Sequence, residues 1–222
     1  SSMLSKLGSA MWFWDRTIDL VVLTHPHADH VDGLIDVLKR YDVGMVIESG
    51  AMYPTSDYDE WNTLVEQKKI PVVHARRGQY IALSDMGTLH ILSPEKEIAG
   101  KRFTNIHDSM VVSKLLYGST TVFFTGDAER FIEYELMVSD IPLAADILKV
   151  GHHGSKTSTT QGFLESVKPQ FAVISAGRKN NYGHPHADVV DRIQAFGTNL
   201  FRTDTDGDIE FMSNGQYVWK SN

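Results

Sequence analysis

The feature that most constrains this chain is a group of histidines directly after a short apolar run. Residues 20–23 (LVVL) predict a buried β-strand, and residues 31–41, which carry apolar side chains at helical spacing, predict a helix. Between them lies the segment 24–30 (THPHADH), at the turn where the strand ends. His25 and His27 are two positions apart, so both side chains can point the same way from an extended backbone and grip one ion.

The same segment ends with a carboxylate and a further imidazole. Asp29 and His30 follow the bend, and we expect them to face a second position beside the first. Imidazole nitrogen and carboxylate oxygen suit zinc, and less selectively manganese or iron. The alternative is a polar loop that holds histidines without a metal, and the strand–turn–helix setting disfavours it.

The HxHxDH pattern of residues 25–30 resembles the signature of the metallo-β-lactamase superfamily. Three later segments resemble the hydrolase-domain branch of the ComEC competence proteins and also the phosphorylcholine esterases: residues 125–127 (TGD), 149–158 (KVGHHGSKTS) and 181–185 (NYGHP). The resemblance extends over about residues 18–211. It implies a four-layer αββα fold of class α/β (α+β), and a hydrolase that uses two divalent metal ions, Zn²⁺ first and Mn²⁺ or Fe²⁺ as alternatives.

The resemblance also implies which residues form the site. The expected metal ligands are His25, His27, Asp29, His30, Asp127, His152 and His184. The expected catalytic residues are Asp29, which orients the attacking water, and His153 and Lys156, which contact the anion or the leaving group. Which member of the 152–153 pair binds metal stays open, as does the choice between ligand and substrate contact for His107.

One residue of this set is expected to be shared by both ions. A carboxylate at Asp127 bridges two cations and lowers their mutual repulsion. The alternative is that Asp127 caps a helix over residues 128–138, which need not exclude metal binding. His186 is expected to cap or orient the segment that follows it.

The chain departs from the family before its first motif. Relatives carry a strand pair upstream, and residues 4–16 show none, so the fold is expected to lack the usual N-terminal strand pair. Trp12, Phe13 and Trp14 in this stretch are expected to pack against the core. A short first sheet leaves an exposed edge, which predicts a homodimer through that edge.

Length and composition bound the remaining questions. The 222 residues are 42% hydrophobic and 22% charged, which predicts one domain over residues 1–222 with a sizeable core. Cysteine is absent, so neither a disulfide nor a thiolate ligand is available. No apolar run reaches the length of a membrane span. The compartment stays open: the chain is expected to be soluble, and either cytoplasmic or exported with its leader absent from this sequence.

A net charge of −7 argues against broad binding to duplex nucleic acid, which depends on neutralising phosphates. Bound cations would offset several carboxylates, however, and four basic residues lie in or beside the motif loops: Lys149, Lys156, Arg178 and Lys179. The hydroxyl side chains around Lys156 suit an anionic group such as phosphate. A locally basic cleft on an acidic chain therefore remains compatible with the sequence.

Further elements follow from periodicity and turn residues. We expect strands at 43–47, 72–74, 79–83, 88–92, 110–116, 120–125, 146–150, 171–175 and 199–202, and helices at 57–69, 128–138, 162–167 and 188–196. Residues 203–208 are expected to form a turn, and strands at 209–212 and 216–219 are expected to close the sheet.

These observations favour a dinuclear metallohydrolase acting on phosphodiesters, in a small molecule or as a nuclease on DNA or RNA. The alternative is hydrolysis of β-lactams or lactones with the same metal centre. A third class, a non-catalytic binding module, would require broken metal ligands, and the ligand pattern is intact.

Overall fold

The structure is a computed structural model that describes residues 2–221. The chain divides into two compact units. Unit 1 comprises Ser1–Ala75 and Glu97–Val111, and unit 2 comprises Arg76–Lys96 and Val112–Asn222. The expectation of a single domain over residues 1–222 stays a prediction.

Unit 1 is a small parallel sheet with helices. Its elements are α1 (Ser2–Ala10), β1 (Thr17–Ile18), β2 (Val21–Leu23), α2 (Ala28–Arg40), β3 (Asp42–Val43), β4 (Val46–Glu48), α3 (Ser56–Gln67), β5 (Val72–His74) and the 3₁₀ turn η1 (Ile106–Ser109). Strands β2, β4 and β5 pair in parallel in the order β2-β4-β5, and β1 pairs with β3. Among the described residues no strand precedes β1, and β2 is an edge strand.

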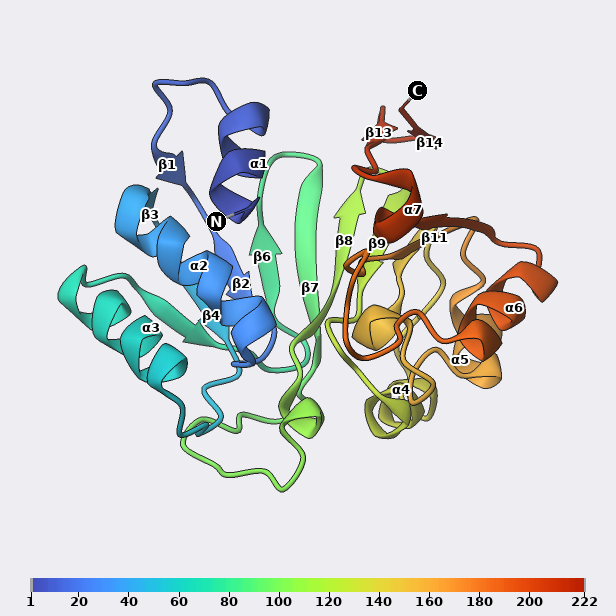
Figure 1. Cartoon of the computed structure of the whole chain (residues 1–222), viewed down its shortest axis with the longest axis horizontal. Coiled ribbons are helices and arrows are strands. Elements are labelled where there is room, and N and C mark those ends of the chain that lie inside the picture. The colour runs from blue at the N-terminus through green and yellow to red at the C-terminus, as the bar shows by residue number, and fades with distance from the viewer. Residues whose placement is uncertain (1, 222) are drawn as a thin grey trace. The chain divides into compact units, whose positions relative to one another are not determined.

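The core of unit 1 lies between this sheet and two helices. Apolar side chains of β2 and β4, such as Leu23 and Val46, are buried with Val31 and Leu38 of α2 and with Trp61 of α3. Figure 1 shows α2 and α3 side by side along the β2-β4 pair. The parallel strands that these helices connect therefore end at one edge of the sheet.

Unit 2 is built on a larger mixed sheet. Its elements are β6 (Tyr80–Ala82), β7 (Gly87–Ser93), β8 (Val112–Tyr117), β9 (Thr120–Phe124), α4 (Arg130–Met137), β10 (Ile147–Lys149), η2 (Gly151–Gly154), α5 (Gln161–Val167), β11 (Phe171–Ile174), α6 (Ala187–Ala195), β12 (Asn199–Arg202), α7 (Thr203–Asp206), β13 (Phe211–Ser213) and β14 (Val218–Lys220). Seven strands pair in the order β12-β11-β10-β9-β8-β7-β6.

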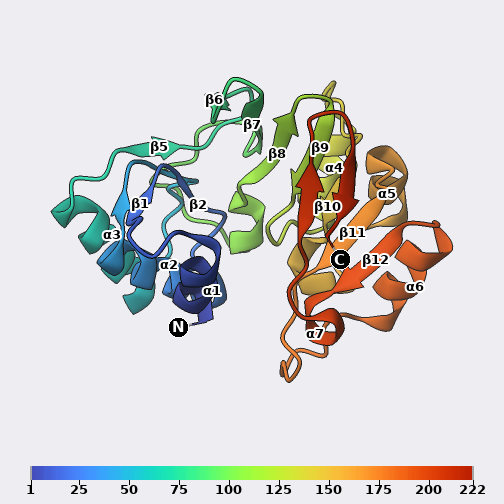
Figure 2. The same cartoon turned by 90° about the horizontal axis from the view of Figure 1, so that it is seen from above.

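Parallel and antiparallel pairing divide this sheet. Strands β9 to β12 run parallel, whereas β6, β7 and β8 join as antiparallel neighbours. Figure 2 shows α4, α5 and α6 gathered along one side of the parallel part. Phe123 of β9 meets Phe163 of α5 edge to face, with ring centroids 5.6 Å apart, and both rings are fully buried. This packing fixes the parallel strands whose carboxyl ends carry the motif loops.

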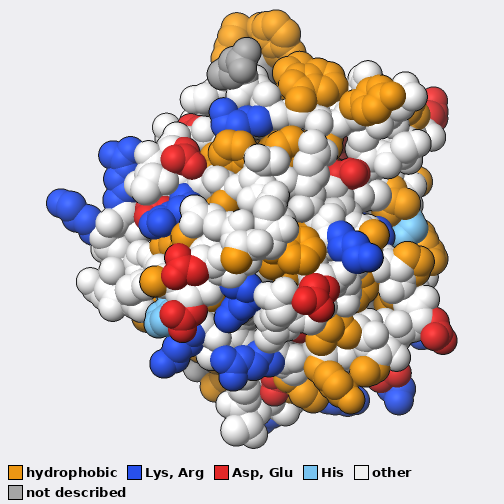
Figure 3. Space-filling model, turned by 90° about the vertical axis from the view of Figure 1, so that its right-hand side faces the viewer, with side chains coloured by type: hydrophobic (Ala, Val, Ile, Leu, Met, Phe, Trp, Pro, Cys, Tyr) orange, Lys and Arg blue, Asp and Glu red, His pale blue; other side chains and the backbone are white. Residues whose placement is uncertain are grey.

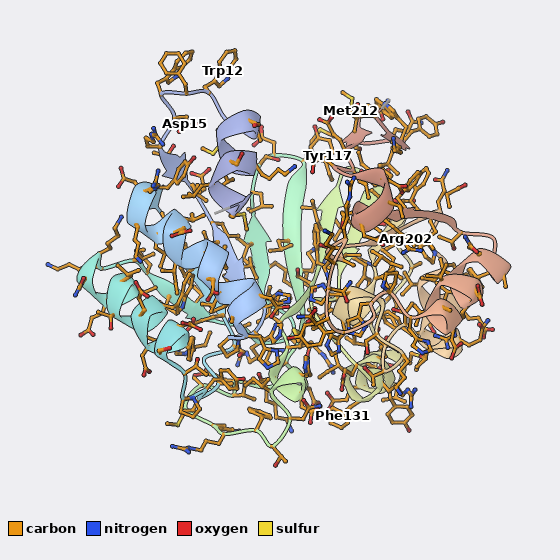
Figure 4. The ribbon with its side chains drawn as sticks, in the orientation of Figure 1. Trp12, Asp15, Tyr117, Phe131, Arg202 and Met212 are labelled. Atoms are coloured by element: carbon orange, nitrogen blue, oxygen red, sulfur yellow. The ribbon has the colours of Figure 1, made fainter. Side chains whose placement is uncertain are left out.

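Three sequence expectations are wrong. Within the described residues, strands β13 and β14 pair with each other in a separate antiparallel hairpin and do not extend the large sheet. Residues 203–206 form the short helix α7 instead of a turn, and Asp206 at its end accepts a hydrogen bond from the backbone N–H of Arg202 at 2.8 Å. In Figure 4, Arg202 lies close to α7, and its guanidinium pairs with Asp204 at 2.6 Å.

The third correction concerns the aromatic residues at the start of the chain. Trp12, Phe13 and Trp14 are 72%, 82% and 62% exposed, so they do not pack into the core. They lie in the loop between α1 and β1, where Trp12 stacks on Trp14 at 5.1 Å and Phe13 meets Trp14 edge-on at 4.6 Å. Figure 4 shows Trp12 at the tip of this loop. The three rings contact one another while their outer faces stay exposed to solvent.

Candidate metal-binding clusters

In unit 1 the candidate ligands lie at the carboxyl end of the parallel strands. The first motif follows β2, Glu48 ends β4 and His74 ends β5, and the pairing register places Leu23 beside Glu48 and Glu48 beside His74. Helix α2 begins at Ala28 with His27 as its N-cap, three residues earlier than expected. Asp29 and His30 therefore belong to the first turn of α2, where a carboxylate complements the positive end of the helix.

The motif brings three imidazoles together with a fourth from η1. His25, His27 and His107 each offer a ring nitrogen, and these three atoms lie within 4.8 Å of one another. His25 is 1% exposed, and its Nε2 is 3.0 Å from Nδ1 of His27. His30 joins the group through its ring, whose centroid is 4.2 Å from that of His25. We call these four residues the unit 1 cluster.

The nitrogen pair of the unit 1 cluster has the spacing of metal ligands. Two nitrogens at 3.0 Å either share a proton or bind one ion. Two ligands of a tetrahedral zinc with Zn–N of about 2.0–2.1 Å lie roughly 3.3 Å apart, close to this spacing. His107 is positioned by Asn105, whose side-chain oxygen accepts a hydrogen bond from the His107 N–H at 3.2 Å. Its place in the cluster supports the ligand alternative for His107.

A cavity of about 380 Å³ lies beside the unit 1 cluster. Tyr53 lines it, and the Tyr53 ring also contacts His27 with centroids 5.4 Å apart. On its wall the buried carboxyl of Glu48 accepts hydrogen bonds from Nε1 of Trp61 at 2.8 Å and from the hydroxyl of Tyr58 at 3.4 Å. Burial raises the pKa of Glu48, although both hydrogen bonds and the nearby His74 oppose that rise.

In unit 2 the first candidate ligand follows β9. Asp127 is 1% exposed and sits in a tight turn, in which Gly126 has a φ of 56°. Lys149 fixes the turn, because its ammonium donates to the Gly126 carbonyl at 3.0 Å. Helix α4 begins only at Arg130, with Glu129 as its N-cap. Asp127 therefore does not cap α4, and that alternative is wrong.

The second group of unit 2 follows β10, where the backbone turns left-handed. His152, His153 and Gly154 have φ values of 43°, 53° and 79°. A left-handed conformation costs a residue with a side chain about 1–2 kcal/mol, and such strain concentrates at functional sites. A Cβ on Gly154 would lie 2.6 Å from Cβ of Pro185, so only glycine fits there. This turn presents both imidazoles beyond the strand end.

The hydrogen bonds of His153 fix its tautomer. Its Nδ1 is 2.7 Å from the backbone carbonyl of Ser175, and a carbonyl only accepts, so Nδ1 carries the proton. Its Nε2 is 3.2 Å from Oδ2 of Asp127. A protonated ring donates from that nitrogen to the carboxylate, whereas a neutral ring presents a lone pair there, so either a proton or a metal ion can lie between the two atoms. The donor set therefore fits a metal ion bound by Asp127 and His153.

His152 is held in a different way. Its Nδ1 donates to Oε1 of Glu129 at 3.0 Å, which leaves Nε2 to face outward, and the Thr157 hydroxyl donates to the same oxygen at 2.7 Å. Burial lowers the pKa of His152, and the two carboxylates Asp127 and Glu129 oppose that shift. A carboxylate on the far nitrogen of a histidine is typical of metal ligands and of proton-transferring histidines alike.

His184 completes the unit 2 cluster, which we define as Asp127, Glu129, His152, His153 and His184. Its ring centroid is 5.6 Å from that of His152. Asn180 shapes the loop, because its side-chain oxygen accepts from the His184 N–H at 2.9 Å and its amide donates to the His184 carbonyl. Burial lowers the pKa of His184, and the nearby His153 adds to this effect. His186 caps α6, as expected, by accepting from the Asp188 N–H.

The hydroxyl side chains around Lys156 do not form the expected anion site. The Ser158 hydroxyl donates to the Gly151 carbonyl at 2.7 Å, and the Ser155 hydroxyl bonds to that of Thr157 at 2.9 Å. These groups build the loop itself, so the expectation that they hold a phosphate is wrong. Lys156 is exposed, and its role stays a prediction.

The chain belongs to the metallo-β-lactamase superfamily. The superfamily's sequence profile matches residues 15–178, about three quarters of the chain. Two curated relatives extend the match. The chain is 32% identical over 197 residues to ComE operon protein 3 of Bacillus subtilis, covering 88% of this chain and 25% of the relative. It is 29% identical over 193 residues to Recombination protein 2 of Haemophilus influenzae, covering 86% and 22%.

These matches confirm the resemblance to the ComEC branch, and the chain spans about a quarter of the length of these relatives. Among solved structures, CmlA, a diiron β-hydroxylase from Streptomyces venezuelae, aligns with a TM-score of 0.54 at 13% identity, covering 84% of this chain and 44% of that one. Identity this low shows the fold alone, and with the family match it confirms the αββα fold class.

The unit 2 cluster also depends on groups that the sequence places only loosely. Glu129 lies two residues after Asp127, close enough in sequence to reach the same site, and the structure makes it the partner of His152. The Ser175 carbonyl, which fixes His153, has no sequence signal because any residue supplies a carbonyl. None of the described helices combines the length and the apolar character that crossing a bilayer requires.

Proposed function

We propose that this chain hydrolyses phosphodiesters with water activated by divalent metal ions, and that its clusters supply the ligands. The observation that carries the proposal is the pairing of His153 Nε2 with a carboxylate oxygen of the buried Asp127 at 3.2 Å, two donor atoms that suit one metal ion. The three close nitrogens of the unit 1 cluster support it independently. Bound divalent ions would acidify a water molecule and stabilise the charge that develops on the substrate.

Two ions, with zinc as the first choice, remain the proposed metal content. The proposed ligands from unit 1 are His25, His27, Asp29 and His30, with His107 as an addition. From unit 2 we propose Asp127, His184 and one member of the 152–153 pair. Because His153 faces Asp127 and His152 is held by Glu129, we assign metal binding to His153 and contact with the substrate to His152. This assignment exchanges the roles that the motif first suggested.

Other residues would orient the reaction. The Asp29 carboxylate is exposed in the first turn of α2, 3.7 Å from Nε2 of His30, and is proposed to orient the attacking water. Lys156 and the basic pair Arg178-Lys179 supply positive charge on loops of unit 2 and are proposed to attract a phosphate. One donor of the Arg178 guanidinium is already used, because its Nε donates to the Asp204 carbonyl at 3.1 Å.

The choice of phosphodiesters over other substrates rests on the relatives. Recombination protein 2 is named for recombination, a process of nucleic acids, and both curated relatives match nearly the whole chain. The net charge of −7 favours a local contact over an extended basic surface. Figure 3 agrees for the face that it shows, where basic and acidic side chains are interspersed.

A substrate panel tests the proposal. Purified protein loaded with Zn²⁺ or Mn²⁺ is assayed with bis-p-nitrophenyl phosphate, single-stranded DNA, RNA and nitrocefin. We expect turnover of the phosphodiesters and its loss in His25→Ala and Asp127→Asn. Turnover of nitrocefin alone would reverse the choice of substrate in favour of β-lactams. Full metal content and undiminished hydrolysis in both variants would defeat the proposed site.

A further inference from the structure

A second cavity lies within unit 2 and is lined by none of the motif residues. It measures about 450 Å³, a size that accommodates a small organic ligand. It opens over β6, β7 and β8, beside the segment that follows α4. Arg77, His90 and Lys114 line it, which makes it a basic cavity in a chain whose net charge is −7.

The strand register places three of its side chains in one row. Tyr80 of β6 pairs with His90 of β7, and His90 pairs with Lys114 of β8. Residues directly opposite one another in a sheet point to the same face, so these three side chains stand side by side. The cavity therefore has a floor set by backbone pairing rather than by a mobile loop.

Arg77 lies at the edge of this floor with its side chain already oriented. Its Nε donates to the backbone carbonyl of Leu92 at 2.9 Å, and its own N–H donates to the Pro94 carbonyl at 2.7 Å. The two terminal nitrogens of the guanidinium have no hydrogen-bond partner among residues 2–221. A guanidinium held this way presents a planar pair of donors that matches the oxygens of a phosphate or a carboxylate.

Lys114 of β8 adds a second cation to the lining of the cavity. It is 8% exposed, and its ammonium donates to the carbonyls of Pro142 at 2.7 Å and Ala144 at 3.1 Å. An ammonium has three donors, so one N–H remains. Burial lowers the pKa of Lys114, and the nearby Asp146 opposes that shift. An anion in the cavity would add a further negative charge that favours the ammonium form.

The other walls suit a ring. The Tyr80 ring is 67% exposed and meets the His90 ring edge to face, with centroids 4.2 Å apart. Neither the Tyr80 hydroxyl nor the His90 nitrogens have a hydrogen-bond partner within the described part of the chain. The single carboxylate of the lining, Asp140, leaves the two cations in excess and can accept a hydrogen bond from a hydroxyl or amino group.

We propose that this cavity binds a small organic oxyanion, with its phosphate or carboxylate group held by Arg77 and Lys114 and its planar body packed against Tyr80 and His90. The site is independent of the proposed hydrolytic function, because it shares no residue with either cluster. The expected ligands have in common an oxyanion attached to a ring, as in a nucleoside monophosphate or an aromatic carboxylate.

Isothermal titration calorimetry on the full chain tests this site, with adenosine 5′-monophosphate, benzoate, adenosine and inorganic phosphate as probes. We expect saturable binding of the monophosphate or of benzoate, and binding of adenosine weaker by about tenfold or more because it lacks the oxyanion. A preference for the monophosphate identifies phosphate as the group bound, and a preference for benzoate identifies carboxylate.

Paired variants locate the binding. Arg77→Gln is expected to weaken binding about tenfold, whereas Arg76→Gln, a neighbouring exposed arginine outside the cavity, should change it less than about twofold. His90→Gln provides a second variant in case Arg77→Gln perturbs folding, which circular dichroism checks. Chelator-treated protein should bind the probe with the same affinity as metal-loaded protein.

Three results would overturn the proposal. The first is no saturable binding of the monophosphate or benzoate up to about 5 mM. The second is equal affinity in wild type, Arg77→Gln and His90→Gln. The third is binding that disappears with the chelator or in Asp127→Asn, which would place the probe at the metal ligands. Hydrolysis of bis-p-nitrophenyl phosphate by Arg77→Gln reports separately on the proposed function.

Discussion

At the residue scale, the two adjacent histidines of unit 2 are each anchored through Nδ1, by the Glu129 carboxylate for His152 and by the Ser175 carbonyl for His153. Each anchor keeps a proton on Nδ1, so a metal ion or a substrate group would meet either ring at Nε2. His153 places its Nε2 3.2 Å from Oδ2 of Asp127, whereas His152 pairs through Nδ1 with Glu129 at 3.0 Å. One turn of backbone thus gives two neighbouring histidines different surroundings, on which the roles proposed for them rest.

Asp127→Asn tests these roles directly. The amide keeps the size of the side chain and removes the negative charge beside His153 Nε2, so we expect loss of at least one metal equivalent. Hydrolysis of a phosphodiester should fall by about 100-fold or more, in line with the loss of a metal ligand. Elemental analysis and steady-state kinetics measure both. Asp191→Asn, an exposed aspartate of α6, is the matched control and should retain both metal and activity.

A second residue-scale prediction concerns pH and the buried Glu48. Its raised pKa means that the folded chain holds a proton there more tightly than the unfolded chain does. The free energy of unfolding should therefore decrease as pH rises through the window between the ordinary glutamate pKa and the raised one. Glu48→Gln, whose amide can still accept from Trp61 and donate to Tyr58, should remove that part of the decrease.

Urea unfolding at several pH values between about 4 and 8 measures this effect. The control is Glu66→Gln, an exposed glutamate of α3, which should follow the wild-type curve. Parallel pH curves for wild type and Glu48→Gln would show that Glu48 contributes nothing to the pH dependence.

At the scale of elements, the motifs were predictable because they occupy the ends of strands. Strand β5 over Val72–His74 and strand β12 over Asn199–Arg202 match their predicted ranges, and the strands before Asp127 and His152 differ only at their ends. Apolar runs bounded by glycine and polar residues carry that information locally. The order of the candidate ligands along the chain, and their attachment to strand ends, could therefore be predicted from the sequence.

What could not be predicted depends on partners distant in sequence. The start of α2 at Ala28 was missed because Asp29 and His30 in its first turn do not show the apolar periodicity of a helix. The exposure of Trp12 and the pairing of β13 only with β14 depend on which surfaces other elements already cover. The loop hydroxyls were assigned to phosphate because composition does not reveal that carboxylates and carbonyls already accept from them.

The loop after β10 also depends on a single buried carboxylate, which yields a prediction. Glu133 of α4 is 1% exposed and accepts from the N–H groups of Thr159 and Thr160, while Arg192 donates to the Thr159 carbonyl at 2.8 Å. Glu133→Ala leaves one buried and one half-buried donor without their acceptor and should cost about 3 kcal/mol of unfolding free energy. Urea denaturation measures the loss.

The matched control for this loop is Glu165→Ala in α5. Glu165 is exposed, and within residues 2–221 its carboxylate accepts only from the Gln161 side chain, at 2.8 Å. We expect its replacement to cost less than about 0.5 kcal/mol. Equal losses for the two variants would contradict a special role of Glu133 in holding the loop.

At the scale of the whole molecule, the chain distributes its candidate ligands over both compact units, and each unit presents them where parallel strands end. In both sheets the candidate ligands therefore lie beyond the carboxyl ends of parallel strands, as is common in α/β proteins. The chain spans about a quarter of the length of its curated relatives, so this arrangement of candidate ligands describes the part of those proteins that matches the chain.

The last prediction follows from ligands in both units. Ions that bind the folded chain and not the unfolded one stabilise it by about 2.7 kcal/mol at 100 times Kd. For a chain of this size, that should raise Tm by about 5–10 °C. Thermal unfolding of chelator-treated protein, titrated with Zn²⁺ or Mn²⁺, measures the shift. His27→Ala in unit 1 and Asp127→Asn in unit 2 should each reduce it, whereas His90→Ala, outside both clusters, should leave it intact. A shift that survives in both ligand variants would place the ions elsewhere.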